Sequence, residues 1–206
     1  RTGSVYRTTY IELTGHLDSQ LGTPGAGDNA AGASIVAELA RVLRSYNSRY
    51  SIRFINYFGH EHQYASGSGY HLTQVESRGE RIKAGMNMDG IAWCPDAPRN
   101  SNVLLVDGNP ESQRIYSLFE NVRTNYGIPI DTRMLRYDQA ASSDNQTYWW
   151  HGMPAVGSIG GVPYNPPGYH MTSPDGGCSD TYDKIDITNV EKISLQNLAV
   201  ILTLDA

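Results

Sequence analysis

The sequence predicts an α/β fold, a three-layer αβα sandwich whose central sheet is mixed and largely parallel. Short runs of β-branched and aromatic residues alternate along the chain with segments in which apolar residues recur at helical spacing. Strands that alternate with helices in this way form a largely parallel sheet with helices on its faces. A length of 206 residues suits one sizeable core, and no repeat or linker divides the chain. We therefore expect residues 1–206 to form a single domain.

Six runs have the composition of strands. The first ends before Gly15 and the second before Gly59, so a glycine marks the turn that follows each of them. The third ends at Asp89-Gly90. The predicted strands span residues 6–14, 51–58, 83–88, 103–106, 132–137 and 154–159.

Five segments have the apolar spacing of helices. In the first, Ile35, Val36 and Leu39 lie on one face of an amphipathic helix. Pro110 opens the third, at a position where its missing N–H has no partner to lose. The predicted helices span residues 29–45, a short segment from residue 66, and residues 110–126, 144–151 and 188–204.

Charge and hydropathy exclude two classes of partner. The net charge is −5, and no basic stripe is visible, which argues against nucleic-acid binding. No run approaches the roughly 18 apolar residues that a membrane-spanning helix needs. We expect a monomer that interacts with neither nucleic acid nor membrane.

The composition also favours a location outside the cytoplasm. The chain is rich in Gly and Tyr and its first residues contain no signal peptide, so we expect any export signal to be absent or removed. We expect a secreted or extracellular protein, with the periplasm as an alternative. Cys94 and Cys178 each lie in a Pro- or Gly-rich loop. They are predicted to form a disulfide, and two unpaired thiols are the alternative.

Imidazole and carboxylate side chains gather where the first three predicted strands end. His16 and Asp18 follow the first strand, Glu61 and His62 follow the second, and Asp89 ends the third. In largely parallel sheets the ligand site lies beyond the carboxyl ends of the strands. A single His or Asp at a strand end is usually structural, but ligands that converge from separate loops are typical of a hydrolytic metal site.

A long loop between residues 160 and 180 is rich in Gly, Pro, Ser and Tyr and contains Tyr169-His170. Loops of this length inside a compact domain are often functional. We therefore expect the loop to contribute to the site.

Taken together, these motifs resemble the di-zinc aminopeptidases of the MH clan, a family that includes bacterial leucyl-type zinc aminopeptidases. The resemblance rests on the order of six motifs and covers the chain from about residue 10 to its end. The matching segments are His16-Leu17-Asp18, Gly25-Ala26-Gly27-Asp28-Asn29, Glu61-His62 before Gly67-Ser68, Asn87-Met88-Asp89, Ser143-Asp144 and Tyr169-His170.

The resemblance implies a cofactor of two zinc ions. Asp28 would bridge the ions, His16 and Asp89 would complete one site, and His170 would belong to the other. The family usually has a second Glu where this chain has His62, so His62 is expected to be the remaining ligand. The register of the motif favours His62, and the neighbouring His60 is the alternative.

The resemblance also implies three residues with catalytic roles. Glu61 would be the general base that takes a proton from the attacking water. Asp18 would hold the His16 ring in the correct tautomer, and Tyr169 would stabilise the oxyanion.

The implied activity is that of a metal-dependent exopeptidase, an aminopeptidase that removes N-terminal residues from peptides. A carboxypeptidase, a glutaminyl cyclase of the same clan, or an inactive binding domain with the same fold are the alternatives. The chain is short for the family, and a trimmed domain is one expected explanation.

Overall fold

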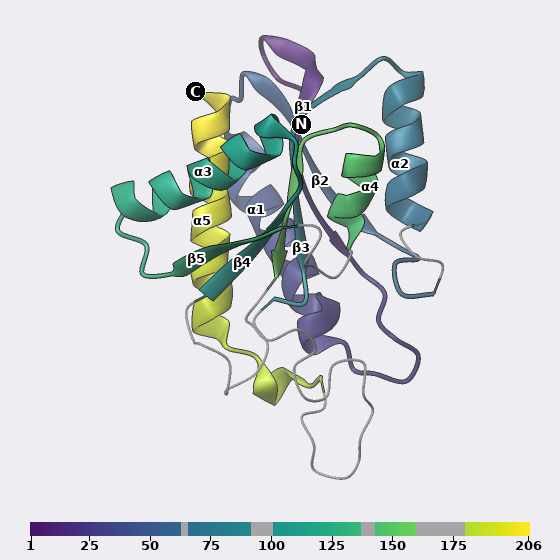
Figure 1. Ribbon diagram of the computed structural model, residues 1–206, viewed down its shortest axis with the longest axis vertical. Helices are drawn as coiled ribbons and strands as arrows, with labels where there is room; N and C mark the ends of the chain where they lie inside the picture. The colour runs from purple at the N-terminus through teal and green to yellow at the C-terminus, as the bar shows by residue number, and fades with distance from the viewer. Residues whose placement is uncertain (63–65, 92–100, 137–142, 160–179) are drawn as a thin grey trace.

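The computed structural model describes residues 1–62, 66–91, 101–136, 143–159 and 180–206. The strands described there form one sheet in the order β2-β1-β3-β6-β4-β5 (Figure 1). The strands are β1 (Tyr6–His16), β2 (Tyr50–Tyr57), β3 (Arg81–Asp89), β4 (Ser101–Val106), β5 (Asp131–Arg136) and β6 (Ala155–Ile159).

Strand direction confirms the mixed, largely parallel sheet. β2, β1, β3 and β6 run parallel to one another, whereas β4 is antiparallel to β6 and parallel to β5. Pairing places His16 beside Tyr57 of β2, and Gly15 beside Met88 of β3. The carboxyl ends of β1, β2 and β3 therefore lie together, at the end of the molecule opposite the chain termini (Figure 1).

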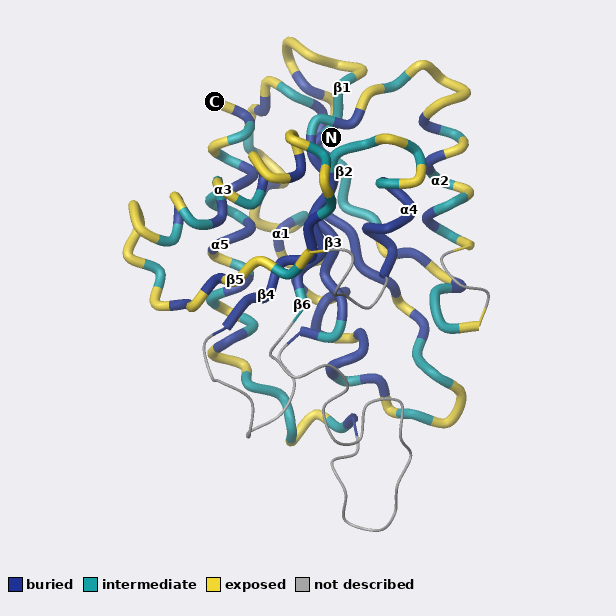
Figure 2. Tube along the Cα trace, in the orientation of Figure 1, coloured by how far each residue is buried: buried dark blue, intermediate teal, exposed yellow. Residues whose placement is uncertain are grey.

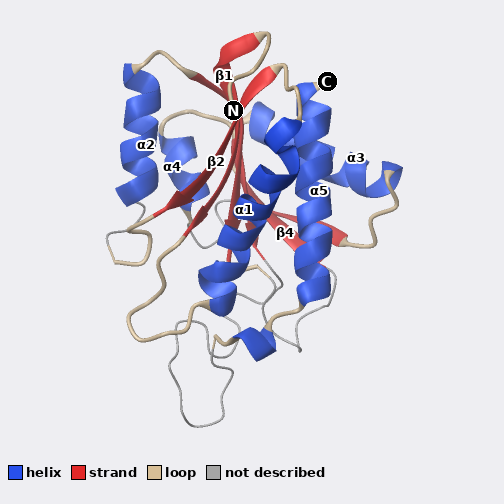
Figure 3. Ribbon diagram, turned by 180° about the vertical axis from the view of Figure 1, so that it is seen from behind, coloured by secondary structure: helices blue, strands red, loops and turns tan. Residues whose placement is uncertain are grey.

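Helices cover both faces of the sheet, as a three-layer sandwich requires. α1 (Gly32–Val42) and α5 (Ile187–Asp205) lie in front of the sheet in Figure 3. α3 (Pro110–Asn125) shares their hydrophobic core. α2 (Ser66–Ser77) and α4 (Asp144–Trp150) cover a separate, smaller core with part of the sheet.

The centre of the sheet is the most deeply buried part of the molecule, whereas β5 at its edge is largely exposed (Figure 2). Leu13 of β1 and Met86 of β3 have no exposed surface, because a sheet covered on both faces buries both sides of its central strands. This burial fixes the strand ends, which provides a rigid base for the side chains that follow them.

The first helix begins later than its apolar spacing predicts. Residues Ala26–Ala31 form a turn of π-helix in which Asp28 and Asn29 have non-helical backbone angles. The Asn29 amide donates hydrogen bonds to the backbone oxygens of His16 and Met88, at 3.3 and 2.8 Å. The turn is thus tied to the ends of β1 and β3, and α1 starts only after it.

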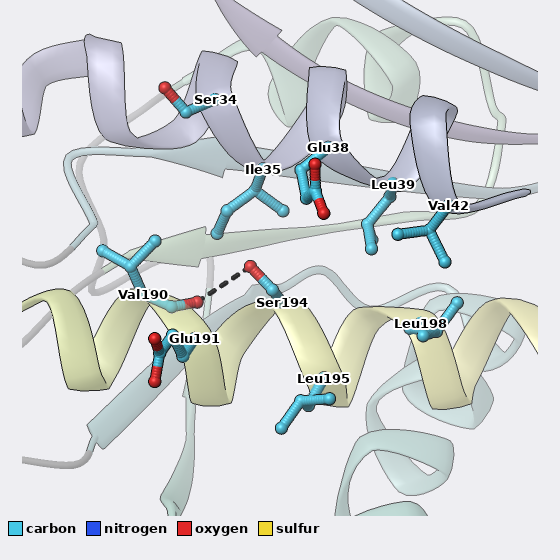
Figure 4. A pocket seen from close by; sticks show the side chains of 10 residues that line it. All are labelled: Ser34, Ile35, Glu38, Leu39, Val42, Val190, Glu191, Ser194, Leu195 and Leu198. Atoms are coloured by element: carbon cyan, nitrogen blue, oxygen red, sulfur yellow. Dashed lines mark hydrogen bonds between the residues drawn. The ribbon is translucent and has the colours of Figure 1, made fainter.

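The helical face of the molecule has an apolar groove of about 450 Å³ between α1 and α5 (Figure 4). Ile35 and Leu39 of α1 lie across it from Val190 and Leu198 of α5. None of the residues predicted to bind metal or take part in catalysis lines this groove.

Within the described ranges, no helix has the length and apolar character needed to cross a membrane.

Candidate metal centre

His16 is the last residue of β1, and its side chain is completely buried. Its Nδ1 donates a hydrogen bond to the backbone oxygen of Asp18, at 2.9 Å. Its Nε2 faces two carboxylates, 3.0 Å from Asp28 Oδ1 and 3.1 Å from Asp89 Oδ1. One imidazole nitrogen therefore fixes the ring, and the other points at a pair of acids.

The two acids come from different elements. Asp89 ends β3, and Asp28 lies in the turn before α1; they are 6% and 4% exposed. Asp180 holds this turn in place, because its carboxylate accepts hydrogen bonds from the backbone N–H groups of Gly27 and Asp28, at 2.5 and 3.0 Å. Segments far apart in the sequence thus converge on His16.

Glu61 lies in the turn after β2, next to this group. The Gln20 side chain donates a hydrogen bond of 2.8 Å to Glu61 Oε2. The Asp18 carboxylate accepts hydrogen bonds from the backbone N–H groups of Glu61 and His60, at 3.0 and 3.2 Å. Both the side chain and the backbone of Glu61 are therefore held in position.

Asp18 contributes to the site in two ways. Its backbone oxygen orients the His16 ring, whereas its carboxylate lies 3.7 Å from His16 Nδ1 and mainly holds the turn with Glu61. Burial raises the pKa of Asp18, but the backbone N–H groups of Glu61 and His60 outweigh burial and keep the pKa below its usual value. The sequence predicts a contact between the Asp18 carboxylate and His16; in the structure the backbone makes the shorter contact.

The electrostatics of the group favour a positive charge at its centre. Burial lowers the pKa of His16, but the charges of Asp89 and Asp28 and the hydrogen bonds to both raise it to about 11. Burial raises the pKa of Asp89, and the His16 charge more than reverses this, so that the pKa lies well below its usual value. A proton on His16 thus balances the buried carboxylates, and a bound cation would balance the same charges.

The donor set fits a zinc ion. Among the described residues, the ligand atoms of His16, Asp28 and Glu61 lie within 4.8 Å of one another, and so do those of His16, His60 and Asp89. Imidazole nitrogen and carboxylate oxygen bind zinc at about 2.0–2.2 Å, so donor atoms about 3 Å apart are compatible with a shared ion. The residues at this end of the sheet are therefore suitable to hold metal.

The structure brings together five of the residues predicted to bind metal or take part in catalysis, and separates one. His16, Asp28, Glu61 and Asp89 form the group and Asp18 supports it, whereas His62 is exposed and belongs to neither set of clustered donor atoms. Its neighbour His60 takes part instead. The remaining predictions, for Tyr169, His170 and the disulfide between Cys94 and Cys178, fall outside the described residues.

Three residues outside the predicted catalytic and metal-binding set support the site. Asp180 holds the Asp28 turn, Gln20 holds Glu61, and Asp144 lies 3.3 Å from His60 Nδ1. Asp144 is part of the Ser-Asp motif and Asp180 follows the long loop, so both were visible in the sequence. Nothing in the sequence distinguishes Gln20.

The chain resembles known proteins in sequence and in fold. The sequence pattern of peptidase family M28 matches residues 2–201. Aminopeptidase YwaD of Bacillus subtilis is 31% identical over 155 residues, which are 74% of this chain and 32% of that protein. The chain thus spans about a third of the length of this relative.

Solved structures share the fold. BSAP, a zinc aminopeptidase from Bacillus subtilis, superposes with a TM-score of 0.80 at 22% identity, over 98% of this chain and 48% of that one. A glutaminyl cyclase from Bacteroides thetaiotaomicron superposes with a TM-score of 0.72 at 17% identity, over 94% of this chain and 73% of that one. At these identities, the likeness concerns the fold alone.

Proposed function

Because the chain belongs to peptidase family M28, we propose that it acts as a zinc-dependent aminopeptidase on peptides. The observation that carries the proposal is the convergence of His16 Nε2 with Asp28 Oδ1 and Asp89 Oδ1, at 3.0 and 3.1 Å. The relatives named aminopeptidases, YwaD and BSAP, support the choice of reaction. The chain spans only a third to a half of their length, so the activity and the substrate class belong to this proposal.

The proposed cofactor is a pair of zinc ions. His16, Asp28 and Asp89 would hold one ion, with Asp28 shared with the second, to which His170 is predicted to contribute. When bound, zinc polarises a carbonyl and lowers the pKa of water. Buried carboxylates around one imidazole support this assignment, because they favour a cation among them.

Glu61 is the proposed general base. It takes a proton from the attacking water and returns it to the leaving amine. Gln20 donates a hydrogen bond of 2.8 Å to the Glu61 carboxylate, and the Glu61 backbone N–H donates one to Asp18. These two contacts keep the Glu61 carboxylate in one orientation. Such a fixed base lowers the entropy cost of proton transfer.

Substrate recognition is proposed to use the same acids. The free α-amine of a peptide carries a positive charge, and it is proposed to lie beside the carboxylates of Glu61 and the ligand Asp89. Tyr169 is predicted to donate a hydrogen bond to the oxyanion. We also propose a monomer outside the cytoplasm, an inference that rests on composition.

A glutaminyl cyclase is the second candidate, because a cyclase shares the fold with a TM-score of 0.72. Both enzymes act at a free N-terminus, but the cyclase closes an N-terminal glutamine on itself and needs no attacking water. The two activities are therefore separated by the substrate that reacts.

The test combines metal content with two substrates. We expect about two zinc ions per chain by elemental analysis, and release of p-nitroaniline from leucyl-p-nitroanilide that stops on chelation and returns with zinc. Acetyl-leucyl-p-nitroanilide, which lacks the free amine, should not react, and the variant Asp28→Asn should lose both zinc and activity. Cyclisation of a glutaminyl peptide without p-nitroaniline release would favour the cyclase, and activity that resists chelation would refute the metal mechanism.

A further inference from the structure

His60 lies against the metal-binding group, although the register of the family motif assigns the ligand position to His62. It follows β2, and its side chain is 10% exposed. Its ring stacks on the His16 ring, with centroids 4.2 Å apart and planes 16° from parallel. His60 Nε2 lies 3.8 Å from Asp89 Oδ2, while His16 Nε2 lies 3.1 Å from Asp89 Oδ1. The two imidazoles therefore face the two oxygens of one carboxylate.

Asp144 orients the His60 ring. It is the first residue of α4, it is completely buried, and its Oδ2 lies 3.3 Å from His60 Nδ1. Its other oxygen accepts a hydrogen bond of 2.6 Å from Ser68 Oγ. A carboxylate on one imidazole nitrogen commonly fixes the tautomer in which the other nitrogen binds metal. In this tautomer His60 Nε2 is the atom that faces Asp89.

We propose that His60 is a ligand of the zinc ion held by His16 and Asp89, and that Asp144 is the residue that positions it. This inference rests on the proposed zinc-dependent function. His16, His60 and Asp89 place their donor atoms within 4.8 Å of one another, and Asp28 Oδ1 lies 3.0 Å from His16 Nε2. This ion then has four protein donors, so a water or substrate oxygen would be a fifth ligand, a coordination number that zinc can reach.

The turn after β2 also affects the second ion. The family usually places a Glu ligand at position 62, and in this chain the residue there is an exposed histidine. The turn after β2 thus directs the imidazole of His60 toward the first ion. It offers no buried ligand at position 62. We expect the two ions to bind with clearly different affinities, the first more tightly.

The test measures metal affinity on the whole chain by competition between protein and a chromophoric chelator. His60→Gln is the main variant, because its amide keeps roughly the length of the side chain and replaces the imidazole nitrogen with groups that bind zinc poorly. His62→Ala tests the rival ligand. His151→Ala, which removes a surface histidine paired with Glu76, is the matched control. Cobalt replaces zinc in a parallel experiment, since its visible absorption reports the number and type of ligands.

We expect His60→Gln to weaken the tightly bound ion by at least about tenfold and to change the visible cobalt spectrum. Asp144→Asn should weaken binding by roughly 10- to 100-fold, as is usual for residues that orient a ligand, and should also change the spectrum. Both His62→Ala and His151→Ala should keep the tight ion. Melting curves of the metal-free variants, compared with the parent chain, separate loss of a ligand from loss of folding.

The outcomes distinguish the two proposals. If the parent chain binds no metal, the proposed function fails and this inference fails with it. If the parent binds zinc and His60→Gln binds it equally well, or if His62→Ala alone loses the tight ion, the role of His60 is refuted while the zinc-dependent function stands.

Discussion

At the scale of single residues, the position of Glu61 suits two chemical roles, that of a zinc ligand and that of a general base. Its carboxylate lies within 4.8 Å of donor atoms from His16 and Asp28, which is compatible with a ligand. It is also held by Gln20, which suits a base that must keep one orientation. A variant that removes its basicity and keeps its shape separates the two uses.

We expect Glu61→Gln to lower kcat/KM by roughly 10²- to 10⁴-fold, the usual contribution of a general base, and to leave the zinc content unchanged. Hydrolysis of leucyl-p-nitroanilide and elemental analysis of the same preparation test this. Glu111→Gln, on the exposed first turn of α3, is the control and should match the parent chain. Loss of zinc together with activity would make Glu61 a ligand.

Residues at strand ends were predictable from the sequence, and the direction of side chains in turns was not. The end of β1 is set by a run of strand-forming residues, so His16 was found with its neighbours. After Gly59, whose φ of 83° is in the left-handed region, side chains no longer alternate as they do in a strand. The choice between His60 and His62 therefore depends on tertiary contacts such as that between His60 and Asp144.

At the scale of elements, the helices and strands of the described residues lie close to their predicted ranges. α3 is one example: its prediction ended one residue beyond Asn125. The order of the strands was not predictable, because the antiparallel pairing of β4 with β6 depends on contacts across the whole sheet. The turn before α1 was missed since its shape is fixed by the Asn29 side chain rather than by local spacing.

The groove between α1 and α5 is lined by both buried and exposed side chains, so the contribution of burial to stability can be tested there. Ile35 of α1 is 1% exposed, whereas Leu195 of α5 is 54% exposed. Ile35→Ala should lower the free energy of unfolding by about 2–5 kcal/mol, because it removes packed methyl groups and leaves a cavity. Leu195→Ala should change it by no more than about 0.5 kcal/mol. Urea unfolding measures both, and equal losses would mean that Leu195 is covered in solution.

At the scale of the whole molecule, the candidate centre joins parts of the chain that are distant in sequence. Side chains of the centre come from β1, from β3, from the turn before α1 and from the turn after β2. Asp180, in the last part of the chain, contacts the turn before α1. The unfolded chain does not hold these groups together. A metal ion that binds them therefore binds the folded state and stabilises it.

This coupling predicts the effect of zinc on thermal stability. At a free zinc concentration about 100 times Kd, the folded state gains about 2.7 kcal/mol. For a chain of this size, that gain corresponds to a rise in Tm of roughly 5–10 °C. Differential scanning calorimetry with buffered zinc, and again after chelation, measures it. Asp28→Asn is the control and should show little or no rise; an equal rise in both proteins would mean that zinc stabilises the fold from somewhere other than this centre.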